Sequence, residues 1–160
     1  MRSSILQMTS VLLLAALPFA AAAAESEVTV SDPYVRLAPP GAPASAAYLV
    51  IRNSGAADRQ LVKAESPAAQ AVELHEHRNE NGVMKMREVG SIAIKARAQT
   101  ELKPGGYHLM LIGVKKALKE GDSVAIMLSF DDGSRQQIDA PVRHTPTDMP
   151  AAMDHGAMKH

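Results

Sequence analysis

Residues 71–87 read Ala-Val-Glu-Leu-His-Glu-His-Arg-Asn-Glu-Asn-Gly-Val-Met-Lys-Met-Arg, two alternating runs on either side of an Asn-Gly pair. Alternation of apolar and polar side chains is typical of a half-buried β-strand. An Asn-Gly pair between two such runs is a strong hairpin signal, because both residues tolerate the left-handed backbone that a tight turn requires. The segment therefore predicts two antiparallel strands joined by a tight turn.

Two registers are open for this hairpin. A turn centred on Asn-Gly pairs His77 with Met86, whereas a loop two residues longer pairs His75 with Met86 and His77 with Met84. Either register places all four side chains on one face, because directly opposed residues share a face. The other face then carries Val72, Leu74, Val83 and Lys85.

The rest of the chain repeats the pattern of short β-like runs between Gly, Pro, Asn and Asp residues, which is typical of an all-β sandwich or barrel. Two short segments, 64–71 and 115–120, could each form a helical turn, but neither is long enough for a helical domain. The expected strands include Val28–Val30, Ala47–Ile51, Leu61–Val62, Ser91–Ile94, Tyr107–Val114, Ser123–Phe130 and Gln136–Val142.

A second pair of candidate ligands occurs in the strand that begins at Tyr107. Alternation places His108 and Met110 on one face of that strand. Two imidazoles and two thioethers brought together would suit Cu(I), because methionine sulfur biases a site toward a soft ion. A lone methionine in a strand is more often core filler, as we expect for Met127. Spacing by itself does not show that this strand meets the hairpin.

The two ends of the chain differ in composition from its middle. Residues 1–24 have a positive start, a short apolar run and an alanine stretch, the pattern of a secretory signal peptide cleaved near Ala24. Residues 25–142 have the length of one domain. Residues 143–160 form a His/Met-rich tail without a periodic apolar face, and such tracts suggest metal binding; it contains His144, Met149, Met153, His155, Met158 and His160.

Composition argues against several classes of function. Without residues 1–24 the chain has 16 basic and 17 acidic residues, so there is no positive excess to bind nucleic acid. No segment after the signal peptide is apolar enough to insert into a membrane. The chain contains no cysteine, which excludes disulfides, thiolate metal sites and blue-copper chemistry.

The spacing His75-x10-Met86-x21-His108-x-Met110 resembles the signature of the PCuAC family of periplasmic copper chaperones. The flanks are similar too, from Val28 to Val142, although Tyr34-Val35-Arg36 stands where many members have Trp-x-Arg. The resemblance implies a cupredoxin-like Greek-key β-sandwich or barrel that binds one Cu(I) through those four residues. His77 and Met84 lie on the same predicted face and are candidates for auxiliary ligands.

The resemblance also implies a function, the delivery of copper in the periplasm toward the CuA centre of cytochrome c oxidase. Separately, we expect the protein to be a monomer and not an enzyme. The expected partners are oxidase subunit II or a Sco-type thiol protein. Some members have a His/Met-rich extension thought to take up Cu(II), and residues 144–160 look like one. Two alternatives remain, a copper scavenger or buffer for copper tolerance, and a metal-free exported interaction module.

Overall fold

The computed structural model describes residues 27–145, and every regular element in that range is a β-strand. The expected signal peptide and nearly all of the expected tail therefore lie outside the described residues. The strands are β1 (Val28–Arg36), β2 (Ala44–Asn53), β3 (Arg59–Glu65), β4 (Ala71–Glu80), β5 (Val83–Glu88), β6 (Ile92–Ile94), β7 (Ala98–Leu102), β8 (Tyr107–Ile112), β9 (Ser123–Phe130) and β10 (Arg135–Arg143). The all-β fold class is confirmed.

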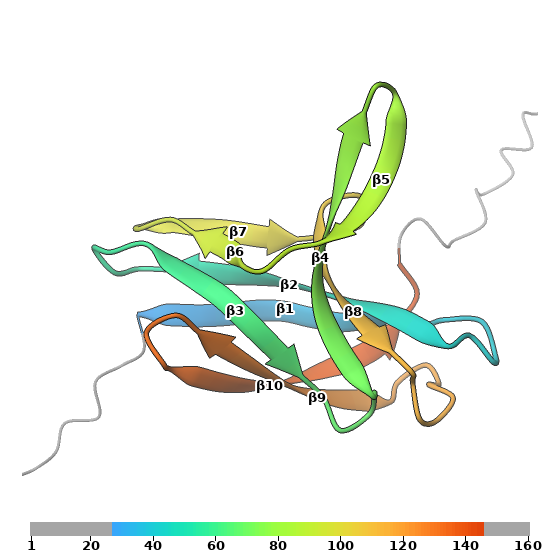
Figure 1. Ribbon diagram of the computed structural model, residues 1–160. Helices are drawn as coiled ribbons and strands as arrows, with labels where there is room; N and C mark the ends of the chain where they lie inside the picture. Colours follow the sequence, from blue (N-terminus) through green and yellow to red (C-terminus); the bar gives the residue numbers. More distant parts are fainter. Residues whose placement is uncertain (1–26, 146–160) are drawn as a thin grey trace, which may run out of the picture.

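The strands follow one another in the order β5-β4-β8-β7-β2-β1-β10-β9-β3-β6, with β8 also pairing with β2. This sheet folds over on itself, so that β10, β9, β3 and β6 form one layer against the remaining strands (Figure 1). The layers are joined where β1 and β10 run parallel, with Val35 opposite Val142.

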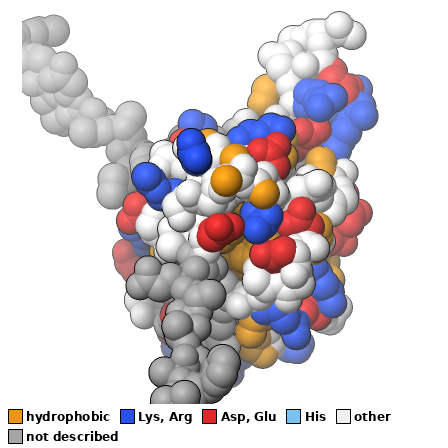
Figure 2. All heavy atoms as spheres, turned by 90° about the vertical axis from the view of Figure 1, so that its left-hand side faces the viewer, with side chains coloured by type: hydrophobic (Ala, Val, Ile, Leu, Met, Phe, Trp, Pro, Cys, Tyr) orange, Lys and Arg blue, Asp and Glu red, His pale blue; other side chains and the backbone are white. Residues whose placement is uncertain are grey.

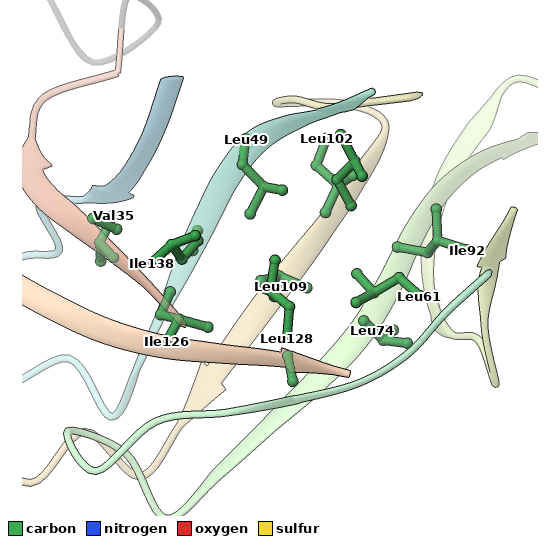
Figure 3. Packing of buried hydrophobic residues seen from close by; sticks show 14 of the residues in the cluster. Val35, Leu49, Leu61, Leu74, Ile92, Leu102, Leu109, Ile126, Leu128 and Ile138 are labelled. Carbon is green, nitrogen blue, oxygen red and sulfur yellow. The ribbon is translucent and has the colours of Figure 1, made fainter. Parts of the chain in front are cut away.

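The core lies between the two layers and follows from period-two alternation. In β9, every second residue is buried, from Val124 to Phe130. Their side chains meet those of the opposite layer, including Leu49 and Leu109, which are almost fully buried (Figure 3). Because successive strand residues point to opposite faces, each core leucine leaves its neighbours on the outer face of the sheet.

The structure differs from the sequence-based expectation in three places. Met127, expected to fill the core, is only partly buried and lies on the face of β9 opposite the buried Ile126 and Leu128. Strand β7 was not expected, because its sequence Ala-Gln-Thr-Glu-Leu is mostly polar, and only Leu102 in it is buried. The two expected helical turns are absent from the described residues: segment 64–71 divides between strand ends and a turn, and 115–120 is irregular. Residues 131–134 form the turn that joins the antiparallel strands β9 and β10.

The β4–β5 hairpin extends beyond the sandwich as a projecting arm, residues 78–87 (Figure 1). Among the described strands, β5 is at the edge of the sheet and pairs with β4 alone. Asn81 and Gly82 form the tip with φ values of 54° and 85°, the left-handed backbone of a tight two-residue turn. The Asn79 side chain accepts a hydrogen bond from Gly82 N at 2.8 Å, which stabilises the tip.

Charged side chains of both signs are interspersed on the face of the molecule that Figure 2 shows. Several are paired on the arm, where Glu80 contacts both Lys85 and Arg87. Residues 27–145 contain no helix that could cross a lipid bilayer.

Candidate metal centre

The candidate ligands lie on the outer face of the sheet, opposite the core. His75 on β4 is directly opposite His108 on β8, and Glu73 is opposite Met110. On the inner face the same two strands bury Leu74 and Leu109. The sequence analysis could not show that these strands meet, and the structure makes them neighbours in one ladder.

The arm brings the thioether of Met86 to the same place. Of the two registers considered, the shorter turn is the one found, with His77 opposite Met86 and Asn79 opposite Met84. The Met86 side chain extends diagonally across β4 and places its Sδ atom 3.2 Å from Nε2 of His108. Two candidate donor atoms, 22 residues apart in sequence, therefore face each other.

Three imidazole rings cluster around this contact. The ring centroid of His108 lies 5.6 Å from that of His75 and 5.0 Å from that of His77, and the His77 ring is stacked with it. Nδ1 of His75 and Nδ1 of His77 are both buried, and neither has a hydrogen-bond partner. Buried polar atoms in native proteins are almost always partnered, so two unpartnered nitrogens on rings next to His108 fit a site that takes a further atom.

An open hollow of about 330 Å³ lies beside the cluster. The loop that follows β1 and the start of β2 form one wall, and side chains from β4, β5 and β8 form the other. The lining residues are Arg36, Ala38, Pro39, Ala44, Ser45, Ala46, Tyr48, His77, Met86, His108 and Met110. Met110, the fourth candidate ligand, therefore reaches the same space as Met86 and His108.

His108 is the most buried member of the cluster, with 2% of its surface exposed. Burial lowers its pKa below the ordinary value of 6.5, and the nearby His77 and His75 lower the pKa further, whereas a hydrogen bond to Gly106 O opposes the shift. The imidazole therefore stays neutral, the state in which it can bind a metal, to a lower pH than a free histidine does.

Two tyrosines extend the cluster away from the arm. The Tyr48 ring lies 6.4 Å from His108, and the Tyr34 ring lies 5.1 Å from Tyr48. The guanidinium of Arg143 lies 4.0 Å above the Tyr34 ring. Tyr34, which stands where many members of the family it resembles have tryptophan, therefore packs against Tyr48, and neither Tyr34 nor Arg143 lines the hollow.

The structure brings all four signature residues to one region. The two auxiliary candidates, His77 and Met84, differ in how close they lie to it. His77 lines the hollow beside Met86, whereas Met84 lies further out on the arm and is 52% exposed. Of the tail candidates, His144 is exposed at the end of β10. Met149, Met153, His155, Met158 and His160 lie outside the described residues.

Two neighbours of the site were missed by the sequence analysis. Glu73 Oε2 lies 2.8 Å from Nε2 of His75, and Gly106 O lies 3.1 Å from Nδ1 of His108. The position of Glu73, two residues before His75 in an alternating strand, could have indicated a shared face. Among the described residues, no group of three or more His, Asp or Glu side chains is arranged to hold a metal ion. Such a group would consist only of His, Asp and Glu side chains, whereas the other candidate metal ligands here are methionine sulfur atoms.

Comparison with solved structures gives the class of fold. The PCuAC domain of PmoF2, described in its copper-bound form, is 20% identical and superimposes with a TM-score of 0.64, over 74% of this chain and 94% of that domain. The protein described as CuI-DR1885 from Deinococcus radiodurans is 31% identical, with a TM-score of 0.63 over 79% of this chain and 85% of that one. The fold is that of the cupredoxin-like PCuAC domains, some of which are known with copper.

Sequence comparison gives the family. Residues 28–142 match the family described as "Putative lipoprotein LpqE-like", and the chain belongs to that family. A protein of Leifsonia xyli subsp. xyli described as "Putative lipoprotein Lxx21020" is 37% identical over 117 residues, which is 72% of this chain and 69% of that protein.

Proposed function

We propose that this protein is an exported copper chaperone that binds one Cu(I) through His75, Met86, His108 and Met110. The observation that carries the proposal is the 3.2 Å contact between Met86 Sδ and His108 Nε2. A thioether and an imidazole nitrogen are both ligands of Cu(I), and their convergence from different strands makes a chelating site. The likeness to the Deinococcus protein described with CuI supports the choice of ion.

The site suits a copper carrier because it can hold Cu(I) and still be reached by a partner protein. Thioethers and neutral imidazoles leave Cu(I) with a single positive charge, and they can be replaced one by one by the ligands of a partner. Met86 is 46% exposed on the projecting arm, so a partner can reach at least one ligand directly. We expect the acceptor to be a thiol protein of the Sco type or subunit II of cytochrome c oxidase, where copper enters the CuA centre.

The proposal also covers where the protein acts and what its C-terminal tail does. We propose that residues 1–24 are a signal peptide and that the protein acts in the periplasm, which accords with a family of lipoprotein-like proteins. In this proposal the His/Met-rich tail, residues 143–160, takes up Cu(II), one electron from a reductant outside this cysteine-free chain converts it to Cu(I), and the core site then binds the Cu(I). Nothing in the site indicates catalysis, and we propose a binding role alone.

The core site is tested by replacing its two sulfurs together. The double variant Met86→Leu/Met110→Leu keeps the apolar volume and removes both thioethers. Cu(I) affinity, measured by competition with a chromogenic chelator, should fall by at least tenfold, which is about 1.4 kcal/mol. Met127→Leu, in β9 and away from the site, is the matched control and should bind as the unaltered protein does. Unchanged affinity in the double variant would show that the two thioethers are not ligands, and no measurable Cu(I) binding by the unaltered protein would favour the metal-free interaction module.

Delivery and buffering are separated in cells. Deletion of the gene should lower cytochrome c oxidase activity when copper is scarce and leave copper tolerance unchanged. Lost tolerance with normal oxidase activity would favour the alternative, a copper scavenger that uses the same site.

A further inference from the structure

The hydrogen bond between Glu73 and His75 determines which nitrogen of His75 is available to a metal. Nε2 of His75 lies 2.8 Å from Oε2 of Glu73. An ionised carboxylate only accepts hydrogen bonds, so the proton of the neutral imidazole is on Nε2. The lone pair is then on Nδ1, which is the buried atom without a hydrogen-bond partner.

His108 has the opposite arrangement. Its Nδ1 lies 3.1 Å from the carbonyl oxygen of Gly106. The carbonyl oxygen and the Met86 thioether that faces Nε2 can both only accept, and because the carbonyl is the stronger acceptor we assign the proton to Nδ1. The lone pair is then on Nε2, the atom that faces Met86 Sδ at 3.2 Å. Each histidine therefore has one nitrogen engaged by an acceptor, whereas the other faces Met86 Sδ in His108 and is buried without a hydrogen-bond partner in His75.

We propose that Glu73 is a positioning residue that fixes the His75 ring, so that Cu(I) is bound through Nδ1 of His75 and Nε2 of His108. The inference rests on the proposed function and adds the residue that prepares the site. Histidine ligands usually donate their second ring N–H to a carboxylate or a backbone carbonyl, which sets the tautomer and the ring orientation. Here Glu73 and Gly106 supply one acceptor of each kind.

Glu73 is placed to act through His75. It lies opposite Met110 in the β4–β8 ladder, and its side chain is 34% exposed, whereas that of His75 is 12% exposed. Its negative charge lies beside an otherwise neutral set of donors, where it also balances the charge of a bound Cu(I). Glu73 therefore acts on the site in two separable ways. Its oxygen accepts the hydrogen bond that fixes the His75 tautomer, and its negative charge balances the charge of Cu(I).

Two substitutions separate these effects, and a third is the control. Glu73→Leu removes both the acceptor and the charge, whereas Glu73→Gln keeps an acceptor oxygen and loses the charge. Glu76→Gln removes a carboxylate from the opposite face of the same strand, where Glu76 pairs with Arg78. Both positions are at least partly exposed, so the three variants are expected to fold.

The readout is imidazole ¹⁵N NMR of the full chain without copper and with one equivalent of Cu(I). We expect His75 to be protonated at Nε2 in the unaltered apoprotein and in Glu73→Gln, and to lose that preference in Glu73→Leu. On addition of Cu(I), the Nδ1 signal of His75 and the Nε2 signal of His108 should shift. Cu(I) affinity should fall about 10- to 100-fold in Glu73→Leu, less in Glu73→Gln, and not in Glu76→Gln.

Two results would overturn the inference while leaving copper binding intact: a His75 protonated at Nδ1 in the apoprotein, or a Cu(I)-induced shift at Nε2 of His75. Equal affinity in Glu73→Leu and the unaltered protein would do the same. If Cu(I) shifts no signal of either histidine in the unaltered protein, the proposed function itself fails, and the copper part of this inference fails with it.

Discussion

His108 is buried on the outer face of a sheet, where polar residues are usually in contact with water. The rings of His75, His77 and Tyr48 surround it, and Met86 covers its Nε2 atom. Burial without a charged partner disfavours the imidazolium form, which is why the pKa of His108 is lowered. The residue is thereby kept in the form that binds a metal.

This shift predicts the pH dependence of the stability of the apoprotein. The pKa of His108 is lower in the folded protein than its ordinary value of 6.5, so the unfolded chain binds more protons between the two values. The free energy of unfolding should therefore be highest above pH 6.5 and fall as the pH is lowered below it. Urea unfolding between pH 7.5 and pH 5 measures the slope.

Replacement of His108 by glutamine should flatten that slope, whatever it does to the stability at neutral pH. The control is His144→Gln, because His144 is exposed and lies outside the cluster. A slope that persists in His108→Gln would assign the effect to other groups.

Met84 and Met86 differ in position on one strand, and we predict different contributions to binding. Both face the site side of the arm, but Met84 is opposite Asn79 near the tip, whereas Met86 is in contact with His108. Met84→Leu should change Cu(I) affinity less than about threefold, below the tenfold step that corresponds to 1.4 kcal/mol. Chelator competition measures it, and a loss as large as that of Met86→Leu would make Met84 a ligand.

For individual residues, the sequence indicated which side chains share a face of a strand but not which of their atoms are in contact. Alternation placed His75, His77, Met84 and Met86 together, since that depends only on strand geometry. The contact of His75 with Glu73 depends on side-chain rotamers, and the acceptor for His108 is a backbone carbonyl. Neither is visible in a pattern of residue types.

The arm is the element that carries Met86 to the site, and its geometry depends on the tip. Asn81 and Gly82 are both in the left-handed region, and the turn they form sets the register of β5 against β4. A shift of that register by one residue would turn Met86 to the other face, away from His108.

Gly82→Ala should therefore weaken the arm and the metal site together. No atom lies within 4 Å of the position a Cβ would take, so the penalty comes from the backbone alone, on the order of 1–2 kcal/mol for an alanine in the left-handed region. Amide exchange in β5 should become faster and Cu(I) affinity should fall.

Gly90→Ala is the matched control for this prediction. It also has nothing within 4 Å, and its φ lies outside the left-handed region, so neither property should change. Equal effects of the two substitutions would show that the tip does not set the register.

The elements also show where sequence-based prediction fails for physical reasons. The hairpin was predictable because its two strands are adjacent in the chain and joined by a specific turn. The pairing of β4 with β8 joins segments about 30 residues apart, and β1 with β10 more than 100, and no local signal specifies such pairs. Strand β7 was missed because its residues are polar and its pairing comes from β2 and β8.

In the whole molecule, the core supports the site from the opposite face of the same strands. Leu109 is fully buried between the layers, and it lies between the two candidate ligands His108 and Met110 in sequence. Leu109→Ala should lower the free energy of unfolding by about 2–5 kcal/mol, the usual range for such a change in a core. Urea unfolding measures the loss.

Copper should offset part of this loss. A ligand that binds only the folded state stabilises it by about 2.7 kcal/mol at one hundred times its dissociation constant. The melting temperature of Leu109→Ala should therefore rise when Cu(I) is added. If Cu(I) raised the melting temperature of the variant but not that of the unaltered protein, the stabilisation could not come from binding to the folded state that both share.

The central claim is that two imidazoles and two thioethers of the folded domain hold one Cu(I). X-ray absorption at the copper edge, on the full chain loaded with one equivalent of Cu(I), tests it most directly. To exclude sulfur from the tail, the measurement is repeated with Met149, Met153 and Met158 changed to leucine. We predict two sulfur and two nitrogen neighbours in both samples. A first shell of nitrogen and oxygen alone in either sample would contradict the claim.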